Sequence, residues 1–235
     1  MKSTAEIIEK QISQWEGDDS MEDFIGNSQK FVKLMSYYKC AIMEVETKFK
    51  VLSEEYSHYH DRNPINNIQS RIKHPYSIMD KMEKKEYPKS LESIEENLDD
   101  IAGVRVICSF PTDVYTLAEA FLKQDDITLI RKKDYIANPK SNGYRSLHLI
   151  VSIPIFLSEG KRQMKVEVQL RSIAMDFWAS LEHQMKYKKD HYFTKEMEEE
   201  LYQCAKISAA LDERMDRLRI SSMGERSRRE KTIIE

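Results

Sequence analysis

The sequence predicts an α/β (α+β) fold, in which helices flank a mixed central sheet of about five strands and long helices stand at both ends. Two kinds of hydrophobic periodicity support this prediction. Towards both ends, apolar residues recur at alternating spacings of three and four, which places them on one face of a helix. Between them the period changes to two, as in strands that bury one face. With 235 residues, of which 40% are hydrophobic, the chain is long enough to bury such a core.

The two stripes predict the long helices. The first predicts a helix of roughly 30 residues or more, and runs through Phe31, Met35, Tyr38, Ile42, Val45, Phe49, Leu52, Tyr56 and Tyr59. The second runs through Met197, Leu201, Cys204, Ser208, Leu211, Met215 and Leu218. Core packing within one subunit is the ordinary use of such a stripe, and association between subunits is the alternative.

Between the stripes, four strands and three shorter helices are expected. The strands are 104–110, 127–131, 147–153 and 164–171, and each alternates apolar and polar residues or forms a short apolar run. Helices are expected at about 112–123, at about 172–187 and from about Tyr76 or Ser77, just after Pro75.

Composition excludes several classes of protein. The chain carries 37 basic and 40 acidic residues, so its net charge of −3 gives no global reason to bind long nucleic acid. Its apolar runs are too short for a membrane span, and its start lacks the basic and apolar regions of a secretory signal. Three widely spaced cysteines without a CxxC pair are typical of reduced thiols. We therefore expect a cytoplasmic protein.

The strands place polar side chains on one face of the sheet. On the last strand Lys165, Glu167, Gln169 and Arg171 alternate with apolar residues, and a solvated sheet face is the ordinary explanation. However, Arg105 and His148 also lie opposite the apolar faces of their strands. If the strands are neighbours, one face collects Arg105, His148, Glu167 and Gln169, with Asp100 at a strand entrance. Two carboxylates from separate strands suit Mg²⁺, which prefers oxygen ligands and keeps several waters.

A basic segment, RIKHPYSIMDKMEKK, offers a site for phosphate. Ser77 and Lys81 are four residues apart, so they share one face of the helix expected after Pro75. A helix N-terminus with a serine and nearby Arg71 and Lys73 can cradle phosphate groups. The segment lacks the glycines of a P-loop, and an ordinary basic surface patch is the alternative.

A loop before the third strand carries an aromatic residue among polar ones. Asn-Pro and Asn-Gly pairs mark the loop in 134–148, and Gly143 permits a turn that exposes Tyr144. An exposed aromatic ring bracketed by Lys, Asn and His side chains can stack on a purine. A hairpin loop with an incidental tyrosine is the alternative.

Four motifs follow one another between about Arg71 and Lys188: RIKxxxSIxxKM, DIAGVRV, YIxxPKxNGYRSLH and VEVQLRSxAMDFWAxxEH. Together they resemble the synthetase domain of the Rel/Spo alarmone enzymes, above all the bacterial small alarmone synthetases. The resemblance implies a nucleotidyltransferase-like synthetase fold. It also implies an N-terminal helical extension (1–60), a catalytic domain (61–190) and a C-terminal helix with a basic tail (191–235).

The resemblance further implies an activity. Such enzymes use Mg²⁺ and transfer pyrophosphate from ATP to the ribose 3′-hydroxyl of GDP or GTP. The products are AMP and (p)ppGpp, the alarmones of the bacterial stringent response. The small members of this family commonly form tetramers, so a homo-oligomer is expected, and the two stripes could supply its contacts.

The resemblance also assigns roles to residues. Arg71 and Arg105 would clasp adenine, and the ATP phosphates would be held by Lys73, Ser77 and Lys81. Asp100 and Glu167 would bind Mg²⁺, and Glu167 would also activate the acceptor hydroxyl. Tyr144 would stack on guanine, and the expected acceptor-site neighbours are Lys140, Asn142, His148 and Lys133, with Lys132 and Arg145 as further candidates. A supporting shell would comprise Gln169, Arg171, Glu182 and His183.

Three rival functions remain to be weighed. The His60-Asp61 pair is similar to part of an HD hydrolase site, but that site needs further ligands over a larger helical domain, so no hydrolase activity is expected. A non-catalytic binder of guanine nucleotides or single-stranded RNA is the second rival, with a basic tail at Arg226, Arg228, Arg229 and Lys231. Two retained carboxylates argue against a pure binder. A helical scaffold with a vestigial domain leaves the ordered motifs unexplained.

Overall fold

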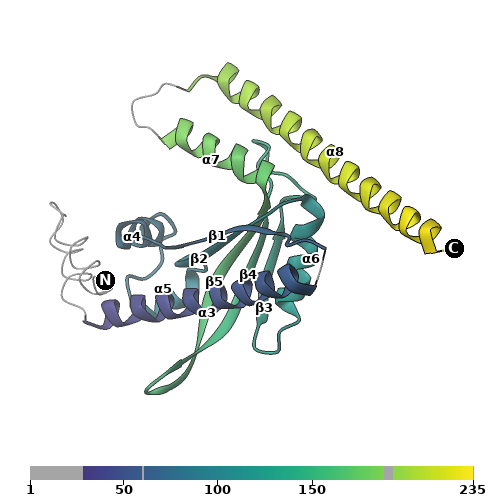
Figure 1. Ribbon diagram of the computed structural model, residues 1–235. Helices are drawn as coiled ribbons and strands as arrows, with labels where there is room; N and C mark the ends of the chain where they lie inside the picture. The colour runs from purple at the N-terminus through teal and green to yellow at the C-terminus, as the bar shows by residue number, and fades with distance from the viewer. Residues whose placement is uncertain (1–28, 60, 188–192, 235) are drawn as a thin grey trace.

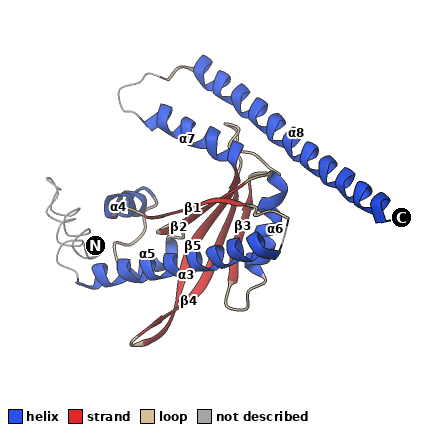
Figure 2. Ribbon diagram, viewed as in Figure 1, coloured by secondary structure: helices blue, strands red, loops and turns tan. Residues whose placement is uncertain are grey.

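A computed structural model describes residues 29–59, 61–187 and 193–234 of the chain (Figures 1 and 2). Its elements in chain order are α3 (Gln29–Tyr59), β1 (Ile65–Ile72), α4 (Pro75–Lys84), α5 (Leu91–Asn97), β2 (Ala102–Cys108), α6 (Pro111–Leu122), β3 (Thr128–Asp134), β4 (Leu147–Leu157), β5 (Gly160–Ser172), α7 (Ile173–Tyr187) and α8 (Lys195–Ile234). His60 of the His-Asp pair lies outside these residues.

The centre of the fold is one mixed sheet with the strand order β1-β2-β5-β4-β3. β2 and β5 are parallel, and the other three neighbouring pairs are antiparallel. The prediction of a mixed sheet of about five strands between long helices is confirmed. As a consequence, β2, β5 and β4 stand side by side and present their polar residues on a common face.

The apolar face of the sheet is covered by α3, whose stripe is buried from Phe31 to Leu52. Figure 1 shows α3 running along the sheet, with α6 beside it. The ring of Phe49 stacks on that of Phe121 from α6, with 4.5 Å between the centroids. The first stripe is therefore core packing within one subunit, although Tyr59 at its end is exposed.

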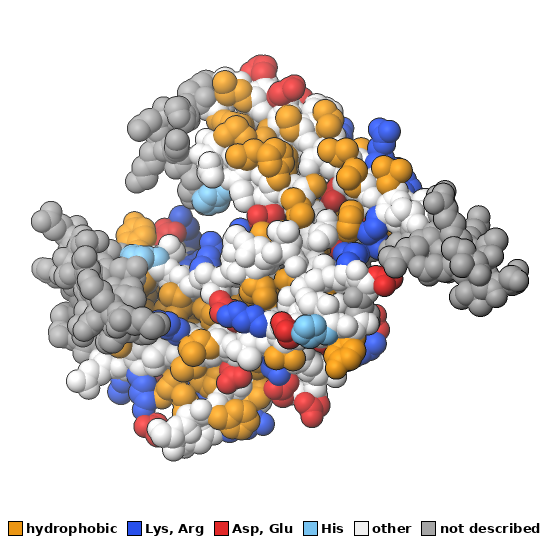
Figure 3. All heavy atoms as spheres, in the orientation of Figure 1, with side chains coloured by type: hydrophobic (Ala, Val, Ile, Leu, Met, Phe, Trp, Pro, Cys, Tyr) orange, Lys and Arg blue, Asp and Glu red, His pale blue; other side chains and the backbone are white. Residues whose placement is uncertain are grey.

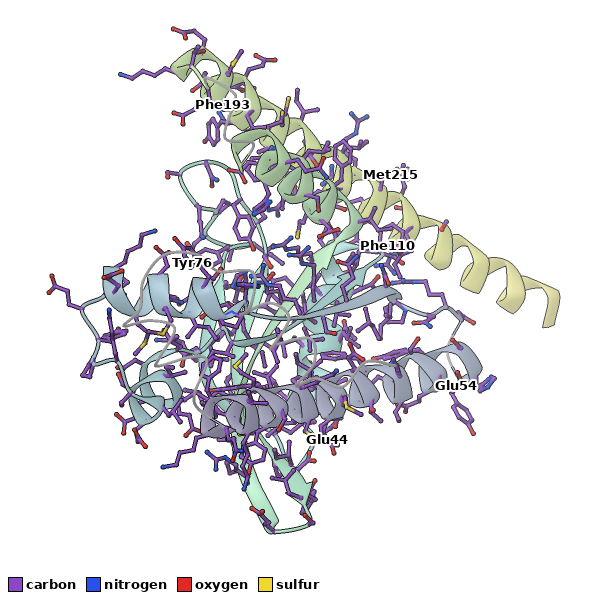
Figure 4. All side chains as sticks on the ribbon, turned by 90° about the vertical axis from the view of Figure 1, so that its left-hand side faces the viewer. Glu44, Glu54, Tyr76, Phe110, Phe193 and Met215 are labelled. Atoms are coloured by element: carbon purple, nitrogen blue, oxygen red, sulfur yellow. The ribbon has the colours of Figure 1, made fainter. Side chains whose placement is uncertain are left out.

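The second stripe behaves differently. α8 buries Leu201 and Ala205, but Met197, Leu211, Met215 and Leu218 are each more than half exposed. Figure 3 shows hydrophobic side chains gathered over the region of α7 and α8, and Figure 4 labels Met215 there.

The reason is that α8 docks through polar residues of another face. Asp212 accepts a hydrogen bond from the hydroxyl of Ser172, and Asp216 accepts one from the backbone of Thr112. The expectation that this stripe packs in the core of its own subunit is wrong, apart from Leu201.

Two elements were not predicted. β1 carries Ile65, Ile68 and Ile72, whose spacings of three and four are those of a helix face, and its pairing with β2 is interrupted by a register shift. α5 is only seven residues long. Among the described residues, no helix combines the length and the apolar character needed to cross a membrane.

Candidate active site

A row of polar residues crosses the sheet from edge to edge. Gln69 of β1 pairs with Arg105 of β2, Arg105 with Gln169 of β5, Gln169 with His148 of β4, and His148 with Lys133 of β3. Residues that pair directly across neighbouring strands share a face of the sheet. The expected gathering of Arg105, His148 and Gln169 is confirmed, and Glu167 lies two residues from Gln169 on the same side of β5.

A cleft of about 1060 Å³ opens over this polar face, between α4 and α7. Many of the expected site residues line it, namely Arg71, Lys73, Ser77, Lys81, Arg105, Tyr144, Gln169, Arg171, Glu182 and His183. Tyr76, labelled in Figure 4, also lines the cleft from the first turn of α4. Residues that the sequence analysis singled out in distant segments therefore line one cleft, and Glu182 and His183 are among them.

The basic segment forms one side of the cleft. α4 begins at Pro75, and the ring nitrogen Nδ1 of His74 caps it by accepting a hydrogen bond from the backbone of Tyr76. Ser77 and Lys81 face the cleft from this helix. Cationic side chains thus surround a helix N-terminus, which favours an anion there.

Asp100 lies beneath these lysines. Lys73 contacts its Oδ2 at 3.0 Å, and Lys81 contacts its Oδ1 at 2.9 Å. Burial alone would raise the pKa of Asp100, but the hydrogen bonds and charges of Lys81 and Lys73 outweigh it and lower the pKa below its ordinary value. Asp100 is therefore an ionised carboxylate held by two lysines that line the cleft.

Two arginines come from adjacent strands. Arg71 of β1 pairs with Gly103 of β2, which presents no side chain, and Arg105 follows two residues later. Nη1 of Arg105 donates to Asp176 at 3.4 Å, whereas its Nε is buried and has no hydrogen-bond partner among the described residues. Burial, followed by the charge of Arg171, lowers the pKa of the Arg105 guanidinium.

The centre of the site is a closed ring of hydrogen bonds. Arg171 donates through Nη2 to the hydroxyl of Tyr144 at 2.6 Å and to Oε1 of Gln169 at 3.1 Å. The Tyr144 hydroxyl lies 2.8 Å from His148 Nε2, and His148 Nδ1 lies 3.1 Å from Glu167 Oε1. Gln169 closes the ring through Nε2 to Glu167 Oε2 at 2.9 Å. Both arms of the ring lead from one guanidinium to one carboxylate.

The two charged groups of this ring, Arg171 and Glu167, fix the direction of the hydrogen bonds that they themselves make. A guanidinium can only donate and a carboxylate can only accept. The Tyr144 hydroxyl therefore accepts from Arg171, and Glu167 accepts the Nδ1 proton of His148, while the direction of the Tyr144–His148 hydrogen bond follows the state of the imidazole. Burial by itself would raise the pKa of Glu167, but the hydrogen bond and charge of His148 and the hydrogen bond of Gln169 lower it overall.

Tyr144 differs from the expectation that its loop exposes it. Its hydroxyl is held in the ring, and the residue is half-buried against the cluster that contains Trp178 and Leu201. The predicted turn is present, because Gly143 has φ +87°. The turn directs Tyr144 inwards, since α8 lies against the loop: a Cβ built on Gly143 would stand 2.5 Å from the Cβ of Ala205.

The chain also matches known proteins. A family model described as a region found in RelA/SpoT proteins matches residues 70–192. GTP pyrophosphokinase YwaC of Bacillus subtilis is 43% identical over 178 residues, which cover 76% of this chain and 85% of that protein. This protein belongs to the RelA/SpoT family.

Two further comparisons support this membership of the RelA/SpoT family. GTP pyrophosphokinase YjbM of B. subtilis is 33% identical over 193 residues, covering 82% of this chain and 90% of that protein. The crystal structure of small alarmone synthetase 1 from B. subtilis, bound to its product pppGpp, superposes with a TM-score of 0.76 at 32% identity. The match covers 83% of this chain and 98% of that one.

The remaining residues expected at the acceptor site of this RelA/SpoT chain are not among those that line the cleft. The amide of Asn142 donates to Glu182 at 3.3 Å, and the ammonium of Lys140 lies 4.8 Å from the centroid of the Tyr144 ring. Lys133 is exposed on β3. Two further acceptor-site candidates lie apart: Lys132 is near the ring of Tyr115, and Arg145 donates to Glu213 of α8.

Asp176 and the contact with α8 were missed by the sequence reasoning. Asp176 lies within the quoted motif, but a carboxylate in the first turn of a helix is ordinarily explained by the helix dipole alone. Ala205 carries no chemical signal at all. Only the folded chain places either residue at the site.

The carboxylate pair is the feature that could hold a metal ion. Within the described ranges, no three His, Cys, Asp or Glu side chains are grouped as a metal site. Asp100 and Glu167 nevertheless interact electrostatically, because the charge of Asp100 acts to raise the pKa of Glu167. Two carboxylates fit Mg²⁺, which takes one or two protein ligands and completes its shell with phosphate oxygens and water.

Proposed function

We propose that this chain transfers pyrophosphate from ATP to the ribose 3′-hydroxyl of GDP or GTP, releasing AMP and forming ppGpp or pppGpp. The observation that carries the proposal is the hydrogen-bonded ring that includes Glu167, because its members Tyr144, Gln169 and Arg171 line the same large cleft as the lysines of the basic segment. The names of the B. subtilis relatives and the product bound to the structural neighbour support the same reaction.

The donor nucleotide fits the side of the cleft formed by β1, β2 and α4. Arg71 and Arg105 offer guanidinium planes on which an adenine can stack. Lys73, Ser77 and Lys81 can bind its phosphates, and each lysine has three N–H donors, of which its contact with Asp100 uses one.

Asp100 and Glu167 would hold Mg²⁺ in this proposal. The ion, when bound, would neutralise charge on the transferred group and lower the pKa of a coordinated hydroxyl. In the described state Asp100 contacts the two lysines instead, and Glu167 accepts a hydrogen bond from His148.

The acceptor nucleotide fits against Tyr144. The ring is covered by Lys140, so guanine would take the place of the ammonium, which could then bind a phosphate. Asn142, His148 and Lys133 complete the acceptor side. Glu167 would receive the proton of the 3′-hydroxyl as that oxygen attacks the β-phosphorus of ATP in line, with AMP as the leaving group.

One incubation tests the function. Purified protein, ATP, GDP and MgCl₂ should yield AMP and ppGpp in equal amounts, resolved by ion-exchange chromatography. Glu167→Gln, which keeps the shape but cannot accept the proton, should lower kcat by several orders of magnitude and retain nucleotide binding. Absence of AMP with the wild-type chain contradicts the proposal, and near-wild-type AMP release by Glu167→Gln removes that residue from its role.

We also propose that the chain acts in the cytoplasm as a homotetramer and does not depend on nucleic acid. Support for an oligomer comes from the outer face of α8, defined by Ile207, Leu211, Met215 and Leu218, all more than half exposed. An apolar stripe of this kind marks a contact surface more often than a solvated one.

A further inference from the structure

Asp176 is the carboxylate that joins the two halves of the cleft. It stands in the first turn of α7, and its side chain is 17% exposed. Its Oδ1 accepts hydrogen bonds from Nη1 of Arg105 at 3.4 Å and from Nη1 of Arg171 at 3.2 Å. One oxygen atom thus contacts an arginine from the donor side and an arginine from the acceptor side.

The two arginines depend on Asp176 to different extents. Arg171 is buried and also bonds Ser146, Tyr144 and Gln169 through its other nitrogens. Arg105, in contrast, has its Nε buried without a partner among the described residues, and its Nη1 donates to Asp176. Loss of the carboxylate would leave Arg105 without a fixed orientation and Arg171 without one of its four acceptors.

The charges of these three groups also indicate that Asp176 is needed between the two arginines. The two guanidiniums repel each other, since the charge of Arg171 acts to lower the pKa of Arg105 and that of Asp176 acts to raise it. A buried and a half-buried cation so close together need an anion between them.

We propose that Asp176 is a positioning residue for both nucleotides: it orients Arg105 towards the donor base and, through Arg171, holds Tyr144 towards the acceptor base. The inference rests on the proposed function, because it assigns Arg105 and Tyr144 to the two bases. Asp176 itself touches neither nucleotide. Its removal must therefore weaken two binding events at once, which a residue of either site alone would not do.

The experiment measures each nucleotide separately on the full chain by isothermal titration calorimetry. The probes are a non-hydrolysable ATP analogue with Mg²⁺, and GDP alone. Asp176→Asn should weaken both dissociation constants at least fivefold, whereas Arg105→Lys should weaken only that for the ATP analogue. Glu95→Gln is the matched control, since it breaks an ion pair with Arg162 away from the cleft and should change neither constant.

A purely structural role predicts a lower melting temperature with unchanged dissociation constants, and that result in folded Asp176→Asn overturns the inference. So does a change in only one of the two constants. If Asp176→Asn does not fold, Asp176→Glu keeps the charge and displaces it by one methylene, and must again weaken both constants together. The wild-type incubation with ATP and GDP is scored separately, so failure of the reaction and failure of this inference are distinguishable.

Discussion

The guanidinium of Arg171 donates a hydrogen bond of 2.6 Å to the phenolic oxygen of Tyr144. This contact ties the loop that precedes β4 to the end of β5, and it aligns the Tyr144 hydroxyl with His148. Since Arg171 is buried and Tyr144 lines the cleft, an interior charge fixes a ring at the surface of the site. The hydroxyl and the ring of Tyr144 therefore have separable roles.

Tyr144→Ala removes both roles, and Tyr144→Phe removes only the hydroxyl. Loss of stacking in Tyr144→Ala should raise the KM for GDP by about 5- to 150-fold, corresponding to about 1–3 kcal/mol. Tyr144→Phe should keep this KM within about threefold and lower kcat instead, because His148 loses its hydrogen-bond partner at Nε2. Steady-state kinetics with GDP varied at saturating ATP separates the two effects. Equal KM values for Tyr144→Ala and the wild type contradict the guanine assignment.

Gly143→Ala tests the contact between the acceptor loop and α8. The added Cβ would lie 2.5 Å from Ala205 at φ +87°, so both a clash and backbone strain are introduced. We expect the KM for GDP to rise and the free energy of unfolding to fall by about 1–3 kcal/mol. Urea unfolding and acceptor kinetics measure the two quantities.

Two variants separate the clash from the strain. Gly160→Ala adds a Cβ at φ +123° with no atom within 4 Å, so it should destabilise the chain without changing the KM for GDP. Ala205→Gly combined with Gly143→Ala restores the space and should recover part of that KM. If the double variant behaves like Gly143→Ala alone, the loop is not positioned by α8.

The features that the sequence predicted correctly are those that depend on the residue pattern within one segment. α3 and strands β2, β4 and β5 bury one continuous apolar face, so their periodicity appears directly in the residue pattern. The polar row through Arg105, Gln169 and His148 follows from that alternation once the strands are neighbours. In both cases the signal is local.

The orientation of Tyr144, the docked face of α8 and the role of Asp176 depend on contacts between distant segments. Tyr144 turns inwards because a buried guanidinium 27 residues away needs an acceptor. α8 buries Asp212 and Asp216, which accept hydrogen bonds from Ser172 and Thr112 respectively. Leu211, on another face of the helix, stays exposed. Spacing within one segment carries no record of such pairings.

Asp100 predicts a dependence of stability on pH. Despite its burial, the hydrogen bonds and charges of Lys81 and Lys73 keep the folded-state pKa below the ordinary value of 3.8. A carboxyl group with a lowered pKa stabilises the folded state above its unfolded-state pKa, and this contribution is lost as pH falls through the folded-state pKa. Asp100→Asn should therefore be less stable than the wild type at about pH 6, with the gap narrowing towards about pH 3. Urea unfolding of both proteins across this range measures the gap, and a gap independent of pH contradicts the assignment.

The outer face of α8 predicts an oligomer that a charge can dissociate. Leu211 is 57% exposed and Met215 51% exposed, one helical turn apart. Light scattering after size exclusion should give the wild type a mass of four chains of 27.8 kDa, and Leu211→Asp with Met215→Asp a smaller species. Met43→Asp places the same charge at a site on α3 that is 58% exposed, and should leave the mass unchanged. Because Leu211, Met215 and Met43 are exposed in the folded chain, circular dichroism should show an intact fold for all the variants. A wild-type mass of one chain, or an unchanged mass for the double variant, contradicts the assembly through this face.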